Sequence, residues 1–171
     1  MPQIHPAHPT DAQQLARFAE HNFRQTFEPT NSKEDMDLYC AQAFGPDVQR
    51  AEIEAPSNTI LLCEQGDNII GFATLHSGTA PDCVHSANAQ EIQRLYVDSE
   101  WHGQGVAQSL MEAAITSAID SAADTLWLGV WKENPRAIAF YKKYGFQAVG
   151  QQAFYLGTDR QQDIVMSRSL L

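Results

Sequence analysis

The sequence predicts an α/β protein built on a mixed sheet of parallel and antiparallel strands. Between residues 91 and 144, strand-like and helical segments alternate, which is typical of parallel pairing. Paired apolar runs at 58–78 and 147–170 flank this region and indicate antiparallel hairpins at both ends. The length of 171 residues suits one core, so we expect residues 1–171 to form a single domain.

The first third of the chain is expected to be helical. Residues 10–27 place apolar side chains at helical spacing, with Thr10 as the expected N-cap. Residues 31–44 predict a second helix capped by Ser32. Residues 45–55 predict a third, short helix.

The rest of the chain is expected to alternate between strands and helices. A hairpin around the turn "GDN" at 58–78 is followed by a loop at 79–89. The other expected strands are 91–98, 125–131, 147–157 and 162–170. The other expected helices are 103–123 and 134–144, the second ended by Gly145 at C′.

Composition argues against several classes of partner and site. A net charge of -10 disfavours nucleic acid and anionic membranes, because phosphate groups need Lys and Arg patches. The three cysteines are far apart and form no C-x-x-C pair, so we expect neither disulfides nor a metal site. No signal peptide and no apolar run of membrane-spanning length is visible, and a cytoplasmic protein is expected.

The segment "HGQGVA", which follows the strand at 91–98, is a candidate phosphate-binding turn. Gly103 and Gly105 allow close approach of a ligand, and the first amides of the next helix point outward. A plain tight turn explains the same residues. A Walker loop is excluded because G-K-[ST] is absent, and Gln108 stands where a dinucleotide fingerprint needs its third glycine.

This turn resembles the acetyl-coenzyme A loop of the GNAT-type N-acetyltransferases, [QR]-x-x-G-x-[GA]. Gly105 and Ala107 match the pattern, whereas His102 stands where the family usually has Gln or Arg. The segment "LGVWKENPRAIAFYKKYGF" resembles the later strand–helix signature of the same family. The terminal segments "FRQTFEPTNSKEDMDLYCAQAF" and "FYLG" also resemble the PaiA-type polyamine N-acetyltransferases.

The resemblance implies the GNAT fold, a strongly twisted mixed sheet flanked by helices and splayed between its fourth and fifth strands. It implies acetyl-coenzyme A as cosubstrate, with the pantetheine arm pairing with backbone groups of Leu95, Tyr96 and Val97. The other expected cofactor contacts are His102, Gly103, Gln104, Gly105, Val106, Ala107, Gln108, Asn134, Arg136 and Lys143.

Transfer of an acetyl group from a thioester to an amine needs a base and an acid. The resemblance places Tyr141 beside the sulfur, where a phenol of pKa ~10 suits protonation of a thiolate of pKa ~8.5. Helical spacing alone favours core packing for Tyr141. Glu91 is the candidate base acting through water, and a solvated strand end explains it equally well. Asn134 before Pro135 also fits an N-cap followed by N1.

The distribution of charge predicts the acceptor. Residues 28–54 carry seven acidic and two basic side chains, whereas residues 132–143 carry four basic side chains against Glu133. A polycationic acceptor and a polyanionic cofactor would each meet an opposite field, although a solvated acidic face explains the first segment too. The expected reaction is acetyl transfer to a polyamine such as spermidine or spermine.

Other functions stay open on the sequence alone. The alternatives are acetylation of a protein N-terminus or lysine, an acetyl-coenzyme A-binding module without catalysis, and, more remotely, a nucleotide-dependent oxidoreductase. A homodimer involving the C-terminal strands is also possible for this family.

Overall fold

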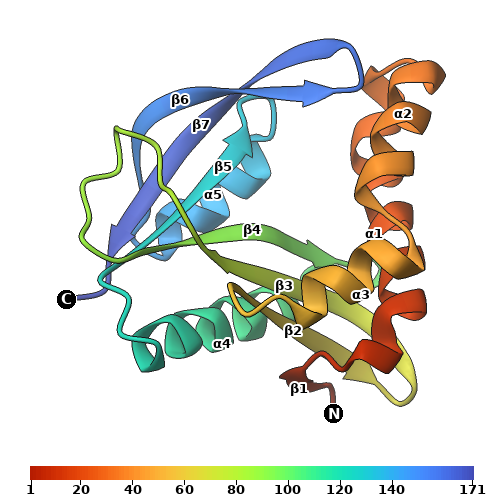
Figure 1. Ribbon diagram of the computed structural model, residues 1–171, viewed down its shortest axis with the longest axis horizontal. Helices are drawn as coiled ribbons and strands as arrows, with labels where there is room; N and C mark the ends of the chain where they lie inside the picture. Colours follow the sequence, from red (N-terminus) through yellow and green to blue (C-terminus); the bar gives the residue numbers. More distant parts are fainter.

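The computed structural model describes residues 1–171 and contains one seven-stranded sheet of order β1-β2-β3-β4-β5-β7-β6 (Figure 1). Every neighbouring pair is antiparallel except β4 and β5, which are parallel. The predicted mixed sheet with hairpins at both ends is therefore confirmed.

The strands are β1 (Gln3–Pro6), β2 (Asn58–Gln65), β3 (Asn68–Ser77), β4 (Ala89–Val97), β5 (Thr125–Trp131), β6 (Gln147–Leu156) and β7 (Asp159–Ser169). The helices are α1 (Ala12–Phe27), α2 (Lys33–Ala43), α3 (Pro46–Glu54), α4 (Val106–Asp120) and α5 (Pro135–Lys143). All predicted helices and hairpins are present. Edge strand β1 has no counterpart among the predictions, because "QIHP" is too short to show alternation.

The beginning of α1 differs from the prediction. Thr10 lies inside a one-turn 3-10 helix, and the N-cap of α1 is Asp11. The Asp11 carboxylate accepts a hydrogen bond from the backbone N–H of His8 at 2.8 Å, so this acidic side chain organises the turn. The Thr10 prediction is wrong, whereas Ser32 caps α2 by accepting from the N–H of Asp35 at 3.1 Å.

Helices cover both faces of the sheet (Figure 1). We call the side covered by α1, α2 and α3 the α1 face; its core includes Phe23, Met36, Leu62 and Phe72. We call the opposite side, covered by α4 and α5, the α4 face; its core includes Leu75, Met111, Leu126, Leu128 and Phe146. None of the helices combines the length and hydrophobicity that crossing a bilayer requires.

The sheet splits between β4 and β5. The two strands pair only from Ala89 opposite Thr125 to Glu91 opposite Trp127, and beyond these residues they diverge. A β-bulge at Gln93 interrupts the pairing of β4 with β3 just past this point. The predicted splay between the fourth and fifth strands is confirmed.

Candidate active site

The predicted phosphate-binding turn connects β4 to α4. Gly103 and Gly105 have φ of 78° and 86°, a left-handed conformation that favours glycine. Gly105 is the N-cap of α4, so the N–H groups of Val106, Ala107 and Gln108 have no helical carbonyl to donate to. Together with the helix dipole, these amides form a site suited to a pyrophosphate.

His102 is held between β4 and α5. Its Nε2 lies 3.0 Å from the carbonyl oxygen of Val97, and its Nδ1 lies 3.0 Å from Nη1 of Arg136. A guanidinium only donates, so Nδ1 accepts and Nε2–H donates, which assigns the neutral tautomer. Both ring nitrogens are therefore engaged, and His102 positions Arg136 beside the glycine turn. The amide of Gln104 is similarly taken by the carbonyl of Glu100 at 2.9 Å.

The second half of β4 has one unpaired edge. Leu95, Tyr96 and Val97 pair with β3 on one side, but no strand lies beside them toward β5. On that side their backbone groups remain available to another extended chain, except the Val97 carbonyl, which accepts from His102. An amide-containing arm such as pantetheine fits this edge as an added strand would.

Three of the predicted cofactor contacts belong to helix α5 and its N-cap. Two lie at its N-terminal end and one at its C-terminal end. Asn134 caps the helix by accepting from the N–H of Ala137 at 3.2 Å, which confirms the N-cap interpretation. Arg136 follows in the first turn and reaches the glycine turn through His102. Lys143 is the last helical residue, about 10 Å further along the axis. The fold therefore brings Arg136, two residues after Asn134, to the turn but places Lys143 away from it.

Tyr141 projects from α5 into the core of the α4 face. Its ring lies 5.5 Å from that of Phe140 and 5.9 Å from that of Phe146, so the packing interpretation holds. Burial raises the pKa of Tyr141 to about 12, which keeps its hydroxyl protonated at physiological pH. Burial also raises the pKa of Tyr96, although the nearby Arg94 guanidinium opposes the shift.

Glu91 lies at the apex of the split, opposite His76 of β3 and Trp127 of β5. Burial raises the pKa of this carboxyl above its usual range, although a hydrogen bond with Gln93 and the proximity of His76 oppose the shift. Because β4 begins at Ala89, Glu91 is not a solvated strand end but a half-buried carboxylate inside the sheet.

Ion pairs neutralise more of the negative charge of segment 28–54 than its composition predicts. Asp37 forms ion pairs with Lys33 and Arg24, both at 3.0 Å, and these hold the pKa of its carboxyl below the usual range. Glu52 pairs with Arg94 at 3.0 Å across 42 residues of sequence. The field on the α1 face is consequently weaker than a count of charges indicates.

Asp163 is a carboxylate on the α1 face that the sequence predictions missed. It lies on β7 opposite Trp131 and is only 9% exposed. The signal that points to it is Gly129, a glycine inside the apolar strand β5, because such a glycine often marks a close approach. No three His, Cys, Asp or Glu side chains gather as metal ligands.

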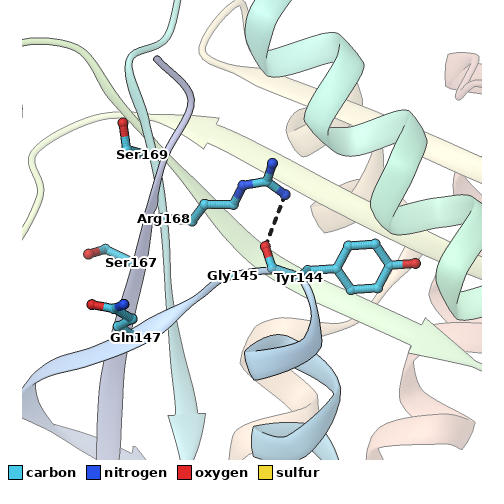
Figure 2. Close-up of a pocket in the computed structure, with 6 residues that line it drawn as sticks. All are labelled: Tyr144, Gly145, Gln147, Ser167, Arg168 and Ser169. Atoms are coloured by element: carbon cyan, nitrogen blue, oxygen red, sulfur yellow. Dashed lines mark hydrogen bonds between the residues drawn. The ribbon is translucent and has the colours of Figure 1, made fainter.

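Two surface cavities lie outside this arrangement. One, of about 440 Å³, is lined by Tyr144, Gly145, Gln147, Ser167, Arg168 and Ser169 (Figure 2). Within it, the Arg168 guanidinium donates to the carbonyl of Tyr144 at 3.0 Å. This cavity borders the C-terminal end of α5, away from Asn134. The other, of about 400 Å³, includes Trp131 but no predicted site residue.

The geometry agrees with a comparison against known families. Residues 16–146 match the model of the Acetyltransferase (GNAT) family. The chain belongs to this family. It is therefore an acetyl-coenzyme A-dependent N-acetyltransferase, and the glycine turn, the split and the capped helix α5 are parts of a GNAT fold.

Three GNAT relatives illustrate the range of similarity. An uncharacterized N-acetyltransferase of Mycobacterium bovis is 32% identical over 162 residues, which cover 95% of this chain and 99% of that protein. The [ribosomal protein bS18]-alanine N-acetyltransferase of Escherichia coli is 27% identical over 140 residues, 80% of this chain and 93% of that enzyme. The crystal structure of PaiA N-acetyltransferase from Thermoplasma acidophilum with coenzyme A has a TM-score of 0.79 at 18% identity, covering 99% of each chain.

The hydrogen bonds of His102 indicate how much this side chain contributes to cofactor binding. We expect His102→Ala to weaken acetyl-coenzyme A binding only about threefold to tenfold, because the turn amides remain and only the orientation of Arg136 is lost. Calorimetric titration with coenzyme A measures this effect, and Lys143→Ala serves as the control at the distant end of α5. A decrease in affinity of more than a hundredfold would mean that His102 itself binds a phosphate group.

Proposed function

We propose that this GNAT enzyme transfers the acetyl group of acetyl-coenzyme A directly to a primary amine of a polyamine such as spermidine or spermine. The observation that carries this proposal is a pair of carboxylates on the α1 face beside the split, Glu91 and Asp163, neither of which pairs with Lys or Arg. A cationic acceptor supplies the missing counter-charge. The sequence resemblance to the PaiA-type enzymes points the same way.

The cofactor contacts follow from the elements around the split. The amides from Gly103 to Gln108 and the guanidinium of Arg136 bind the phosphates. The backbone from Leu95 to Val97 pairs with the pantetheine amides, and the side-chain NH2 group of Asn134 reaches the same arm. His102 and Gln104 stabilise the turn. All of these contacts lie within the single domain of residues 1–171.

The acid and the base act from opposite sides of the split. An alkylamine has a pKa near ~10 and is protonated at neutral pH, so it must first lose a proton. Glu91, with its raised pKa, receives this proton through a water molecule. The amine nitrogen then bonds to the acetyl carbon, the carbon–sulfur bond breaks, and the nitrogen loses its second proton to solvent, from which Tyr141 is later reprotonated. Tyr141 gives its hydroxyl proton to the departing sulfur.

The second candidate is acetylation of a protein N-terminus, favoured by the similarity to the ribosomal protein bS18-alanine enzyme. A peptide acceptor needs an open groove. Here the tip of the β6–β7 hairpin reaches α2 (Figure 1), where Thr158 donates to Asp35 at 2.7 and 2.8 Å. Gln161 also donates to Asn31 at 2.7 Å. These contacts bridge the α1 face and favour a small acceptor.

Release of free thiol from acetyl-coenzyme A tests the choice between acceptors. We expect kcat/KM for spermidine and spermine to exceed that for lysine and for an alanine-initiated peptide by about tenfold or more, because charge-assisted contacts discriminate by this factor. Mass spectrometry of the product identifies the acetylated nitrogen. A peptide preferred over every polyamine would overturn the proposal in favour of protein acetylation.

A further inference from the structure

Asp163 is a buried carboxylate held in a space that Gly129 leaves open. Its Oδ2 lies 3.1 Å from the position that a Cβ on Gly129 would occupy, and the amide nitrogen of Gln152 lies 2.5 Å from the same point. Any side chain at position 129 would therefore displace both groups. Asp163 is 9% exposed, and no hydrogen bond or ion pair to its carboxylate forms within the protein.

The direction in which Asp163 faces follows from the alternation of β5. Leu126, Leu128 and Val130 point into the core of the α4 face. The intervening residues, including Gly129 and Trp131, therefore point to the α1 face. The carboxylate over Gly129 is thus on the α1 face, opposite to the helices α4 and α5 that carry the proposed cofactor contacts.

Glu91 lies on the same face at a distance that the strand register determines. It neighbours Trp127, whereas the Asp163 carboxylate lies over Gly129, two residues further along β5. With about 3.3 Å per residue and about 4.8 Å between strands, the two positions are on the order of 8 Å apart in the plane of the sheet. This separation is comparable to the span between the two ammonium groups of a short diamine.

Aromatic side chains surround the same place. Trp131, the β5 partner of Asp163, lies 5.4 Å from the ring of Phe27, which in turn lies 6.4 Å from the ring of Phe154. Aromatic faces attract organic cations, and a carboxylate forms charge-assisted hydrogen bonds with ammonium groups. Burial also raises the pKa of Asp163 to about 6, as expected for a carboxyl that lacks a cationic partner in the protein.

We propose that Asp163, with Trp131 beside it, binds the second ammonium group of a diamine or polyamine acceptor whose reacting nitrogen lies at Glu91. This inference rests on the proposed amine acetylation and adds a determinant of specificity. Asp163 takes no part in the chemical step. It selects acceptors that carry a second positive charge at the right distance.

A pair of acceptors of equal length isolates this contact. Butylamine and putrescine share the same carbon chain, but only putrescine carries a second ammonium group. For the native enzyme we expect kcat/KM to favour putrescine by about tenfold to a hundredfold, as for a hydrogen bond to a charged group. In Asp163→Asn the preference falls to near one, through a higher KM for putrescine. Asp120→Asn, a change at an exposed residue at the end of α4, is the matched control and keeps the preference.

Each other outcome decides against the subsite. If Asp163→Asn lowers kcat/KM equally for both amines, Asp163 acts at the reacting nitrogen or in folding. If the native enzyme does not prefer putrescine, no residue binds the second ammonium group. If spermidine and spermine, like these two amines, are not acetylated, the proposed function fails by itself. Calorimetric titration of the coenzyme A-loaded protein then tests the subsite directly: binding of putrescine that exceeds binding of butylamine, and that Asp163→Asn abolishes, supports it. Equal binding overturns it.

Discussion

Replacing Tyr141 by phenylalanine is expected to lower kcat for acetyl transfer by about 10²–10⁴-fold, the usual contribution of a general acid. The dissociation constant for coenzyme A should change little. The ring remains packed against Phe140 and Phe146, so only the hydroxyl is lost. Stopped-flow thiol release and calorimetric titration measure the two quantities separately.

The size of this effect follows from the protonation state of Tyr141. Burial raises its pKa to about 12, so the hydroxyl carries its proton over the whole working range. Passing that proton to a thiolate of pKa ~8.5 is uphill by roughly 5 kcal/mol, well within the ~16 kcal/mol barrier of an enzyme turning over about ten times per second. Without the hydroxyl, the thiolate departs with no proton donor.

The pH dependence separates this acid from the base. The loss of turnover in Glu91→Gln, relative to the native enzyme, should become smaller as pH approaches ~10, because more of the amine is then already deprotonated. In Tyr141→Phe the defect should persist over the same range. A Tyr141→Phe enzyme with native turnover would remove this residue from the chemistry and leave it a packing role.

The fold was largely accessible from the sequence because its signals are local. The hairpin at 58–78, the alternation from 91 to 144 and the Ser32 cap each depend on neighbouring residues. The incorrect prediction of Thr10 as N-cap shows the limit of such local signals. Thr10 and Asp11 are adjacent polar residues, and the hydrogen bond from His8 to the Asp11 carboxylate determines where the helix begins. The short strand β1 forms only because β2 pairs with it.

The sequence predicts those residues of the candidate site that lie in one continuous motif. It does not predict those that folding brings together from distant parts of the chain. Gly103 to Gln108 and Asn134 lie in recognisable segments. The partners of His102 are five and 34 residues away in sequence, so its bridging role arises only in the folded chain. Charge counting also failed for Glu52, whose partner Arg94 lies on another element. Asp163 belongs to no motif, and its neighbour Gly129 is 34 residues earlier.

Asp163→Asn is expected to raise the free energy of unfolding by about 3 kcal/mol above pH 7, with almost no gain near pH 4. Burial moves the pKa of this carboxyl from 3.8 to about 6 on folding. Between these values the folded state binds the extra proton, so the native protein loses stability as pH rises from ~4 to ~6. Asparagine has the same shape and carries no charge. Urea denaturation of both proteins across this range measures the difference.

The neighbours of Asp163 make the interpretation of this experiment direct. Gln152, Gly129 and Trp131 do not titrate, so the pH dependence of the difference belongs to the carboxyl. A gain that is constant with pH would indicate packing rather than charge, and a loss of stability at pH 8 would contradict an unpaired buried carboxylate. A cation that binds only the folded state stabilises it in proportion to its occupancy. Putrescine at pH 8 should therefore stabilise the native protein and reduce the difference in free energy of unfolding between it and Asp163→Asn. Butylamine should leave this difference unchanged.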